Sequence, residues 1–142
     1  MESGWDITSG DNSIVIAILD DGCDLTHPDL NFLNNGFNAG NLMNNGDAIG
    51  SHGTAVAGIA AATIDNNLGV AGVAGNCRIL PIAMPNLSWL EIATGMRWAA
   101  DNGANIINCS FGGYVTNNPI ICLLYTSPSP RDATLSRMPS SA

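Results

Sequence analysis

The sequence predicts an α/β fold built on a mostly parallel sheet, and three observations support that prediction. The run at 14–19 is apolar and continuous, which is typical of a strand buried on both faces, and the stretch at 78–84 is another apolar run after Arg78. A further short strand is indicated at 105–109. Segments with helical signals, 52–64 and 88–102, lie between these runs. Strands that alternate with helices favour βαβ units, whose strands are parallel.

The first half of the chain leads from a buried strand to a helix. The strand at 14–19 ends in Asp20-Asp21-Gly22. Residues 31–50 are rich in Asn and Gly and contain two Asn-Asn-Gly turn signals, so we expect a surface loop there. A short strand is expected near Phe37 within this loop. We expect the loop to be followed by a helix over 52–64 that is rich in small residues.

The second half repeats the strand–helix–strand order. The run at 78–84 contains Pro81, which cannot donate a hydrogen bond to a sheet. Ser88 and Glu91 have the spacing of a capping box, because each side chain can bond to the other residue's backbone N–H. We therefore expect a helix to begin at Ser88 and to end shortly before the strand at 105–109.

Bulk composition excludes several classes of function. A chain of 142 residues with 46% hydrophobic residues is long enough for one domain with its own core. The net charge is −8 and lysine is absent, so nucleic-acid binding is not expected. No apolar run approaches the ~20 residues that span a bilayer, so no membrane insertion is expected. The cysteines lack Cys-x-x-Cys spacing and are expected to be buried free thiols: Cys23, Cys77, Cys109 and Cys122.

The composition changes abruptly at Cys122, where a tail rich in Ser and Pro begins. Residues 122–142 resemble the translation of a transposon-type sequencing adapter, with a variable index at Ala133–Leu135 between two constant parts. We hypothesise that 122–142 is a disordered segment foreign to this gene, and that residues 1–121 are its credible domain.

Asp20 and His52 are the candidate catalytic pair. Asp20 follows a buried strand, where parallel sheets place ligands and catalytic groups, and His52 begins a helix. A carboxylate that bonds to one imidazole nitrogen leaves the other free to take a proton. Alternatively, Asp20 closes a turn and His52 caps a helix. A third reading is a receiver-like binding domain with an acidic Asp20-Asp21 pocket, but such a domain needs a lysine, which the chain lacks.

Four segments in this order resemble the subtilisin-like serine proteases, the subtilase or peptidase S8 family. They are Ala17–Asp24, Thr26–Leu30, Ser51–Gly58 and Asn108–Gly113. The resemblance implies a partial, truncated form of that family's three-layer α/β fold. It also implies hydrolysis of peptide bonds by an Asp-His-Ser triad. The three residues occur in this order along the chain of subtilisin.

The resemblance assigns roles to individual residues. Asp20 resembles the catalytic aspartate and His52 the general base. Ser110, Phe111 and Gly112 resemble the stretch whose backbone pairs with the substrate as an added strand. Asp21 departs from the Ser or Thr often seen after the aspartate, so we expect its carboxylate to face outward or to be paired.

The nucleophile of the family has no counterpart in this sequence. The family's serine lies in a Gly-Thr-Ser-x-x-x-Pro motif, which does not occur here, and Ser127 and Ser129 fall in the foreign tail. The resemblance therefore implies an N-terminal fragment of a protease domain that is inactive as given. A non-catalytic subtilase used for binding is the alternative.

The resemblance also implies a structural Ca²⁺ site. Asp29 resembles the family's calcium carboxylate. The Asn66 side chain and the carbonyls of Ile64, Leu68 and Val70 resemble the loop that completes it. Hard oxygen ligands of this mixed type suit Ca²⁺. The alternative is an Asn-rich turn beside a capping aspartate.

The remaining expectations follow from the resemblance. The substrate is a polypeptide, the parent protease is a monomer, and it is extracellular or secreted. Met1–Asp6 contains neither a basic region nor an apolar stretch, so no signal peptide is visible in this chain.

Overall fold

The computed structural model describes residues 2–112. The expected boundary at residue 121 and the tail at 122–142 lie outside this part. In chain order the helices and strands are α1 (Glu2–Trp5), β1 (Val15–Asp20), β2 (Phe37–Asn38), α2 (His52–Ala61), β3 (Arg78–Ala83), α3 (Trp89–Asp101) and β4 (Ile106–Cys109). The predicted order of strands and helices from β1 to β4 is confirmed, and α1 is an additional short helix that the sequence did not predict.

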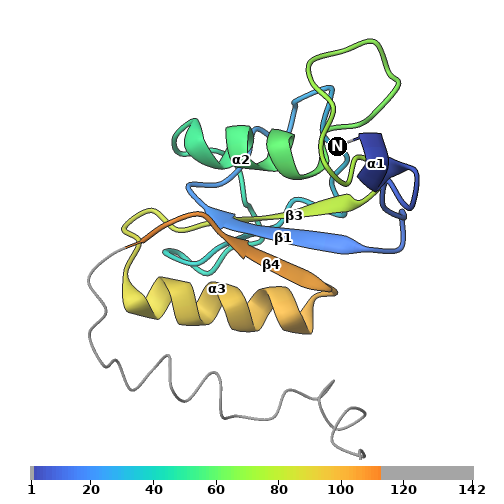
Figure 1. The fold of residues 1–142 in the computed structure, drawn as a ribbon. Helices are drawn as coiled ribbons and strands as arrows, with labels where there is room; N and C mark the ends of the chain where they lie inside the picture. The colour runs from blue at the N-terminus through green and yellow to red at the C-terminus, as the bar shows by residue number, and fades with distance from the viewer. Residues whose placement is uncertain (1, 113–142) are drawn as a thin grey trace, which may run out of the picture.

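The described strands form one sheet of four, in the order β2-β3-β1-β4, and every pairing is parallel. Helix α2 covers one face of the sheet and helix α3 covers the other, so the chain forms three layers (Figure 1). The predicted α/β class is therefore confirmed. In such a sheet all strands end at one edge, where the loops into the helices gather.

Strand β1 lies between β3 and β4 and separates two apolar clusters. Its residues alternate between the two faces, as strand geometry requires. Ala17 and Leu19 pack in the cluster on the α3 side, and Ile16 and Ile18 pack in the cluster on the α2 side. All six residues of β1 are buried, which confirms the prediction of a strand covered on both faces.

Strand β3 includes Pro81 even though proline interrupts hydrogen bonding in sheets. In a parallel strand, alternate residues direct their N–H groups to opposite neighbours. Arg78 donates to Ile14 on the β1 side, and Ile79 donates to Asn31 on the other side. Pro81 has the same orientation as Ile79, and β2 pairs only with Ile82 and Ala83. The missing donor of Pro81 therefore faces away from β1.

Helix α2 ends three residues earlier than the sequence predicts. Ala62 leaves the helix with a ψ of 139°, and its N–H bonds to Gly58. Asp65, Asn67 and Gly69 then have positive φ, which a helix does not allow. The predicted extension to Ile64 is therefore wrong.

Two further expectations concern cysteines and membranes. Cys23 and Cys77 are buried free thiols as expected, but Cys109, in the edge strand β4, is exposed, so that part of the prediction is wrong. Cys122 lies outside the described residues. None of the helices within residues 2–112 is long and apolar enough to cross a bilayer.

The predicted capping box of α3 gives a test of helix-end stability. The Ser88 side chain accepts the Glu91 N–H at 3.2 Å, and the Glu91 carboxylate accepts the Ser88 N–H at 2.9 Å. We expect Ser88→Ala to lower the free energy of unfolding by about 1 kcal/mol. Ser51→Ala is the matched control because Ser51 flanks α2 without a side-chain cap bond. Urea unfolding measures both, and equal losses would contradict this assignment.

Candidate active site

Asp20 and His52 meet at the edge of the sheet where the parallel strands end. Asp20 is the last residue of β1, and His52 is the first residue of α2. The His52 Nδ1 atom lies 2.8 Å from Asp20 Oδ1 and 2.9 Å from Oδ2. The Asp20 side chain is 8% exposed, whereas the His52 side chain is 60% exposed. The imidazole is therefore held from beneath by a buried carboxylate and faces solvent.

The local backbone fixes this pair from both sides. Asp20 is bound in β1, and its Oδ1 also accepts the Asp21 N–H at 2.8 Å. The start of α2 lies directly against β1, since a Cβ atom on Gly53 would be 3.0 Å from Asp20 Cβ and would overlap the Gly22 carbonyl oxygen. Glycine at position 53 therefore allows the helix to bring His52 into contact with Asp20.

The electrostatic setting favours proton transfer at the outer nitrogen of His52. The hydrogen bond that His52 donates to Asp20, followed by the charge of Asp20, raises the pKa of His52, and the charge of Asp21 adds to this. A proton on Nδ1 is held by Asp20, which leaves Nε2 as the acceptor. The arrangement is that of a general base oriented by a carboxylate.

Cys23 lies next to this pair but is not a nucleophile. It is fully buried, and its thiol donates to the Gly53 carbonyl at 3.6 Å. Burial, and then the charges of Asp20 and Asp21, raise the pKa of Cys23 to about 12. A thiol in this state is protonated at neutral pH and is unreactive.

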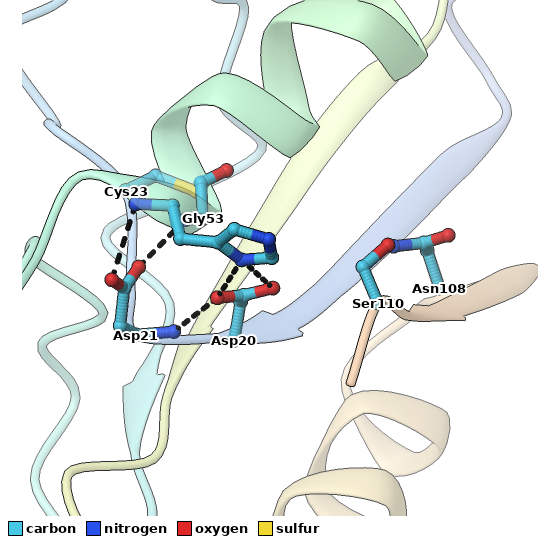
Figure 2. Close-up of polar contacts among 7 residues, drawn as sticks. Asp20, Asp21, Cys23, Gly53, Asn108 and Ser110 are labelled. Carbon is cyan, nitrogen blue, oxygen red and sulfur yellow. Dashed lines mark hydrogen bonds and ion pairs between the residues drawn. The ribbon is translucent and has the colours of Figure 1, made fainter. Parts of the chain in front are cut away.

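The segment predicted to bind substrate begins at the same sheet edge as Asp20. Leu19 of β1 pairs with Cys109 of β4, so Ser110 follows at the same sheet edge as Asp20. Figure 2 shows Asp20 and Ser110 at the ends of neighbouring strands. Ser110 is exposed and its Oγ accepts from the Asn108 side chain at 2.9 Å. Phe111 packs on the α3-side cluster, and Gly112 has open space around it.

A family model described as the Subtilase family matches residues 11–136. The chain belongs to the subtilase family. A thermophilic serine proteinase from Bacillus sp. (strain AK1) is 40% identical over 120 residues, which are 76% of this chain and 28% of that protein. Membership in a protease family disfavours the receiver-like reading.

Solved structures and a further relative agree with this assignment. The crystal structure of fervidolysin from Fervidobacterium pennivorans, a keratinolytic enzyme related to subtilisin, superposes with a TM-score of 0.66 at 32% identity. The match covers 84% of this chain and 20% of the fervidolysin chain. A calcium-dependent protease from Trichormus variabilis is 35% identical over 124 residues, which are 79% of this chain and 17% of the relative. The chain therefore spans less than a third of these relatives' length.

Among the residues of this subtilase that are expected to bind calcium, Asp29 contacts the Asn66 side chain and the backbone of Val70. Asp29 is 1% exposed. Its Oδ1 accepts from the Asn66 amide nitrogen at 2.6 Å, and its Oδ2 accepts the Val70 N–H at 3.0 Å. These two bonds lower the pKa of Asp29. The Asn66 Oδ1 atom accepts the Leu68 N–H at 2.9 Å, and Ile64 is half-buried in the same loop.

The fit of this loop to calcium is incomplete. The donor set, with one carboxylate, one amide and three carbonyls, has the hard oxygen chemistry that Ca²⁺ prefers. However, both oxygens of Asp29 already accept N–H groups, and Asn66 presents its nitrogen to them. Among residues 2–112, no three His, Cys, Asp or Glu side chains gather as a metal cluster. Calcium binding would therefore require the Asn66 amide to turn its oxygen inward.

The Asp21 carboxylate is paired, which is one of the two outcomes that the sequence predicts. It accepts the backbone N–H groups of His52 and Gly53, more than thirty residues along the chain. No local pattern shows which donors it would meet. The only signal was its departure from the small hydroxyl residue that subtilases often have after the aspartate.

Proposed function

We propose that this chain carries the aspartate and the general base of a serine endopeptidase, with Asp20 and His52 in those roles. The observation that supports the proposal is the bond between a buried carboxylate and Nδ1 of an exposed imidazole at the carboxyl edge of a parallel sheet. That geometry leaves Nε2 available to a nucleophile from solvent or from a later part of the protease domain.

In this proposal His52 takes the proton of a serine hydroxyl at Nε2 while that oxygen attacks the peptide carbonyl. Asp20 stabilises the imidazolium that forms and keeps the ring in the productive tautomer. His52 then returns the proton to the leaving amine. Ser110–Gly112 pairs with the backbone of the polypeptide substrate, consistent with its place beside Asp20 and its exposed end.

The chain as given is proposed to be inactive because its sequence holds no Gly-Thr-Ser motif. We also propose that residues 122–142 are the translation of a sequencing adapter and that residues 1–121 are encoded by the gene. The family match runs to residue 136 and so includes part of that segment. By resemblance, the parent protease is a secreted monomer.

The test is to sequence the genomic locus with long reads across the codon for Ile121 and to express the gene product so defined. We expect its continuation to encode Gly-Thr-Ser, and we expect casein hydrolysis and labelling by a fluorophosphonate. The 142-residue chain should show neither. Serine-dependent labelling and turnover by the 142-residue chain would contradict the proposal. An extended product with Gly-Thr-Ser and no activity would favour the non-catalytic alternative.

We further propose that Asp29, Asn66 and the carbonyls of Ile64, Leu68 and Val70 bind a structural Ca²⁺. The contacts of Asp29 with Asn66 and Val70 support this proposal. For calcium to bind, the Asn66 amide must rotate so that its oxygen faces Asp29. We expect excess Ca²⁺ to raise the Tm of the chain by several degrees relative to chelator, because a ligand of the folded state stabilises it.

A test variant at Asp29 and a control variant in the loop at 64–70 distinguish the site from a general effect of charge. Asp29→Asn should abolish the Ca²⁺-dependent rise in Tm. Asp65→Asn removes a charge from an exposed neighbouring residue and should leave the rise intact. A folded chain whose Tm is the same in Ca²⁺ and in chelator would disprove the site.

A further inference from the structure

Helix α2 begins without a cap from its own segment. The first N–H groups of a helix have no partner within it and need an acceptor. Ser51 stands at the N-cap position, but its backbone has φ −111° and ψ −9°, and its side chain makes no cap bond. The first turn of α2 also lacks an acidic residue. The acceptors for its N–H groups must therefore come from elsewhere.

Asp21 supplies these acceptors from the end of β1. Its Oδ2 accepts the His52 N–H at 3.2 Å, and its Oδ1 accepts the Gly53 N–H at 2.6 Å (Figure 2). A negative charge at the start of a helix is also favoured by the helix dipole. The carboxylate thus acts as a bidentate cap for α2, supplied by a residue that precedes His52 by 31 positions.

The backbone around Asp21 leaves room for this carboxylate at two glycines. A Cβ atom on Gly50 would overlap Asp21 Oδ2, and one on Gly53 would lie 2.9 Å from Oδ1. Both glycines therefore permit a contact that any side chain would obstruct. A single hydroxyl, as in the Ser or Thr often found here in the family, offers one oxygen rather than two separated ones.

We propose that Asp21 is a positioning residue that fixes the backbone of His52 while Asp20 fixes its ring. Asp20 and Asp21, adjacent at the end of β1, then hold His52 by its ring and by its backbone N–H. The backbone bond sets where α2 begins relative to β1, and the Nδ1 bond sets the orientation of the imidazole. The inference deepens the proposed function, since it rests on His52 being the base.

Among residues 2–112, the charges that raise the pKa of His52 are those of Asp20 and Asp21. Asp20 contacts the ring directly, and Asp21 lies against the backbone of the same residue. The Cys23 thiol, packed beside them, is neutral. The negative charge of Asp21 raises the pKa of His52, as a smaller contribution than that of Asp20. Removal of this charge should therefore be visible in the titration of His52.

The test uses ¹H–¹⁵N NMR on the full 142-residue chain. In the unsubstituted chain we expect the His52 and Gly53 amides to exchange about five- to tenfold more slowly than in an unstructured peptide, because each donates to Asp21. Asp21→Ala should remove this protection at both amides. Asp21→Asn keeps one acceptor oxygen, so protection should persist at only one of the two amides.

The ring of His52 gives a second readout, because an uncharged helix cap at the same place would not move its pKa. Asp21→Asn should lower the pKa of His52 because the charge is lost. Asp24→Asn is the matched control, since the Asp24 carboxylate accepts bonds from Thr26 and none from His52. It should leave both the amide exchange and the pKa of His52 unchanged.

Two results would overturn the inference. One is exchange of the His52 and Gly53 amides at unstructured rates in the unsubstituted chain while later amides of α2 are protected. The other is a pKa of His52 that is the same in Asp21→Asn as in the unsubstituted chain. Neither amide exchange nor the pKa of His52 depends on catalysis. A gene product without peptidase activity would therefore refute the proposed function, and these two measurements would still decide the role of Asp21. If Asp21→Ala fails to fold, these same two measurements still decide.

Discussion

Asp20→Asn is expected to lower the pKa of His52 strongly, because the asparagine removes the charge and the hydrogen bond that raise it. An asparagine amide can also donate to Nδ1, which would place the neutral ring's proton on Nε2. In a gene product that carries the nucleophile, that wrong tautomer should lower kcat by about 10⁴-fold, the loss measured for the same change in another serine protease. NMR titration of the ring and steady-state kinetics measure the two effects.

The same substitution should change how stability depends on pH. The pKa of His52 is raised in the folded chain, so its pairing stabilises the fold below the unfolded value of about 6.5. This contribution is lost as the pH rises through the higher, folded pKa. Asp20→Asn should reduce this pH dependence, leaving the smaller part that the charge of Asp21 contributes. Asp101→Asn, which breaks the exposed pair with Arg97, is the control. A His52 titration unchanged by Asp20→Asn would contradict the pairing.

Gly53→Ala is expected to separate α2 from β1 and so to break the contact between His52 and Asp20. The new Cβ atom would overlap the Gly22 carbonyl oxygen and approach Asp21 Oδ1 and Asp20 Cβ. The Gly22 oxygen is a backbone atom and Asp20 Cβ is attached to the backbone of β1, so neither can move aside easily. The helix must therefore shift. We expect a loss of about 1–3 kcal/mol in the free energy of unfolding, despite alanine's better helix propensity.

Gly58→Ala is the matched control for this substitution because it lies in the same helix. The atom nearest to its added Cβ is Val70 Cγ2 at 3.9 Å, an ordinary contact. Alanine should therefore stabilise α2 by up to ~1 kcal/mol. Urea unfolding measures both variants. Equal changes in stability at positions 53 and 58 would show that close approach to β1 is not what requires glycine.

Local patterns were sufficient to predict much of the fold. The buried runs at 14–19 and 78–84 became β1 and β3 because continuous apolar segments need cover on both faces. The Ser88–Glu91 spacing located the start of α3 because the capping box is a contact between near neighbours. The pairing of Asp20 with His52 was predicted from the resemblance of their flanking segments to subtilases, because an aspartate at a strand end and a histidine at a helix start are weak signals by themselves.

Contacts between distant segments could not be predicted in the same way. The bonds from Asp21 to the start of α2 depend on how the loop at 31–50 returns to β1. The early end of α2 depends on the bond from Thr63 N–H to the Asp29 carbonyl, which draws the chain away from the helix. The Asn66 amide faces Asp29 with its nitrogen, an orientation that residue identity does not specify.

The protonation of the His52 ring tests most directly whether Asp20 prepares it as a base. The ¹⁵N shifts of both ring nitrogens can be followed through a pH titration of the unsubstituted chain. We predict a pKa above the ordinary value of about 6.5 and, once the ring is neutral, a proton on Nδ1 with Nε2 free. A pKa at or below that value, or a neutral ring protonated on Nε2, would contradict the role proposed for Asp20 and His52.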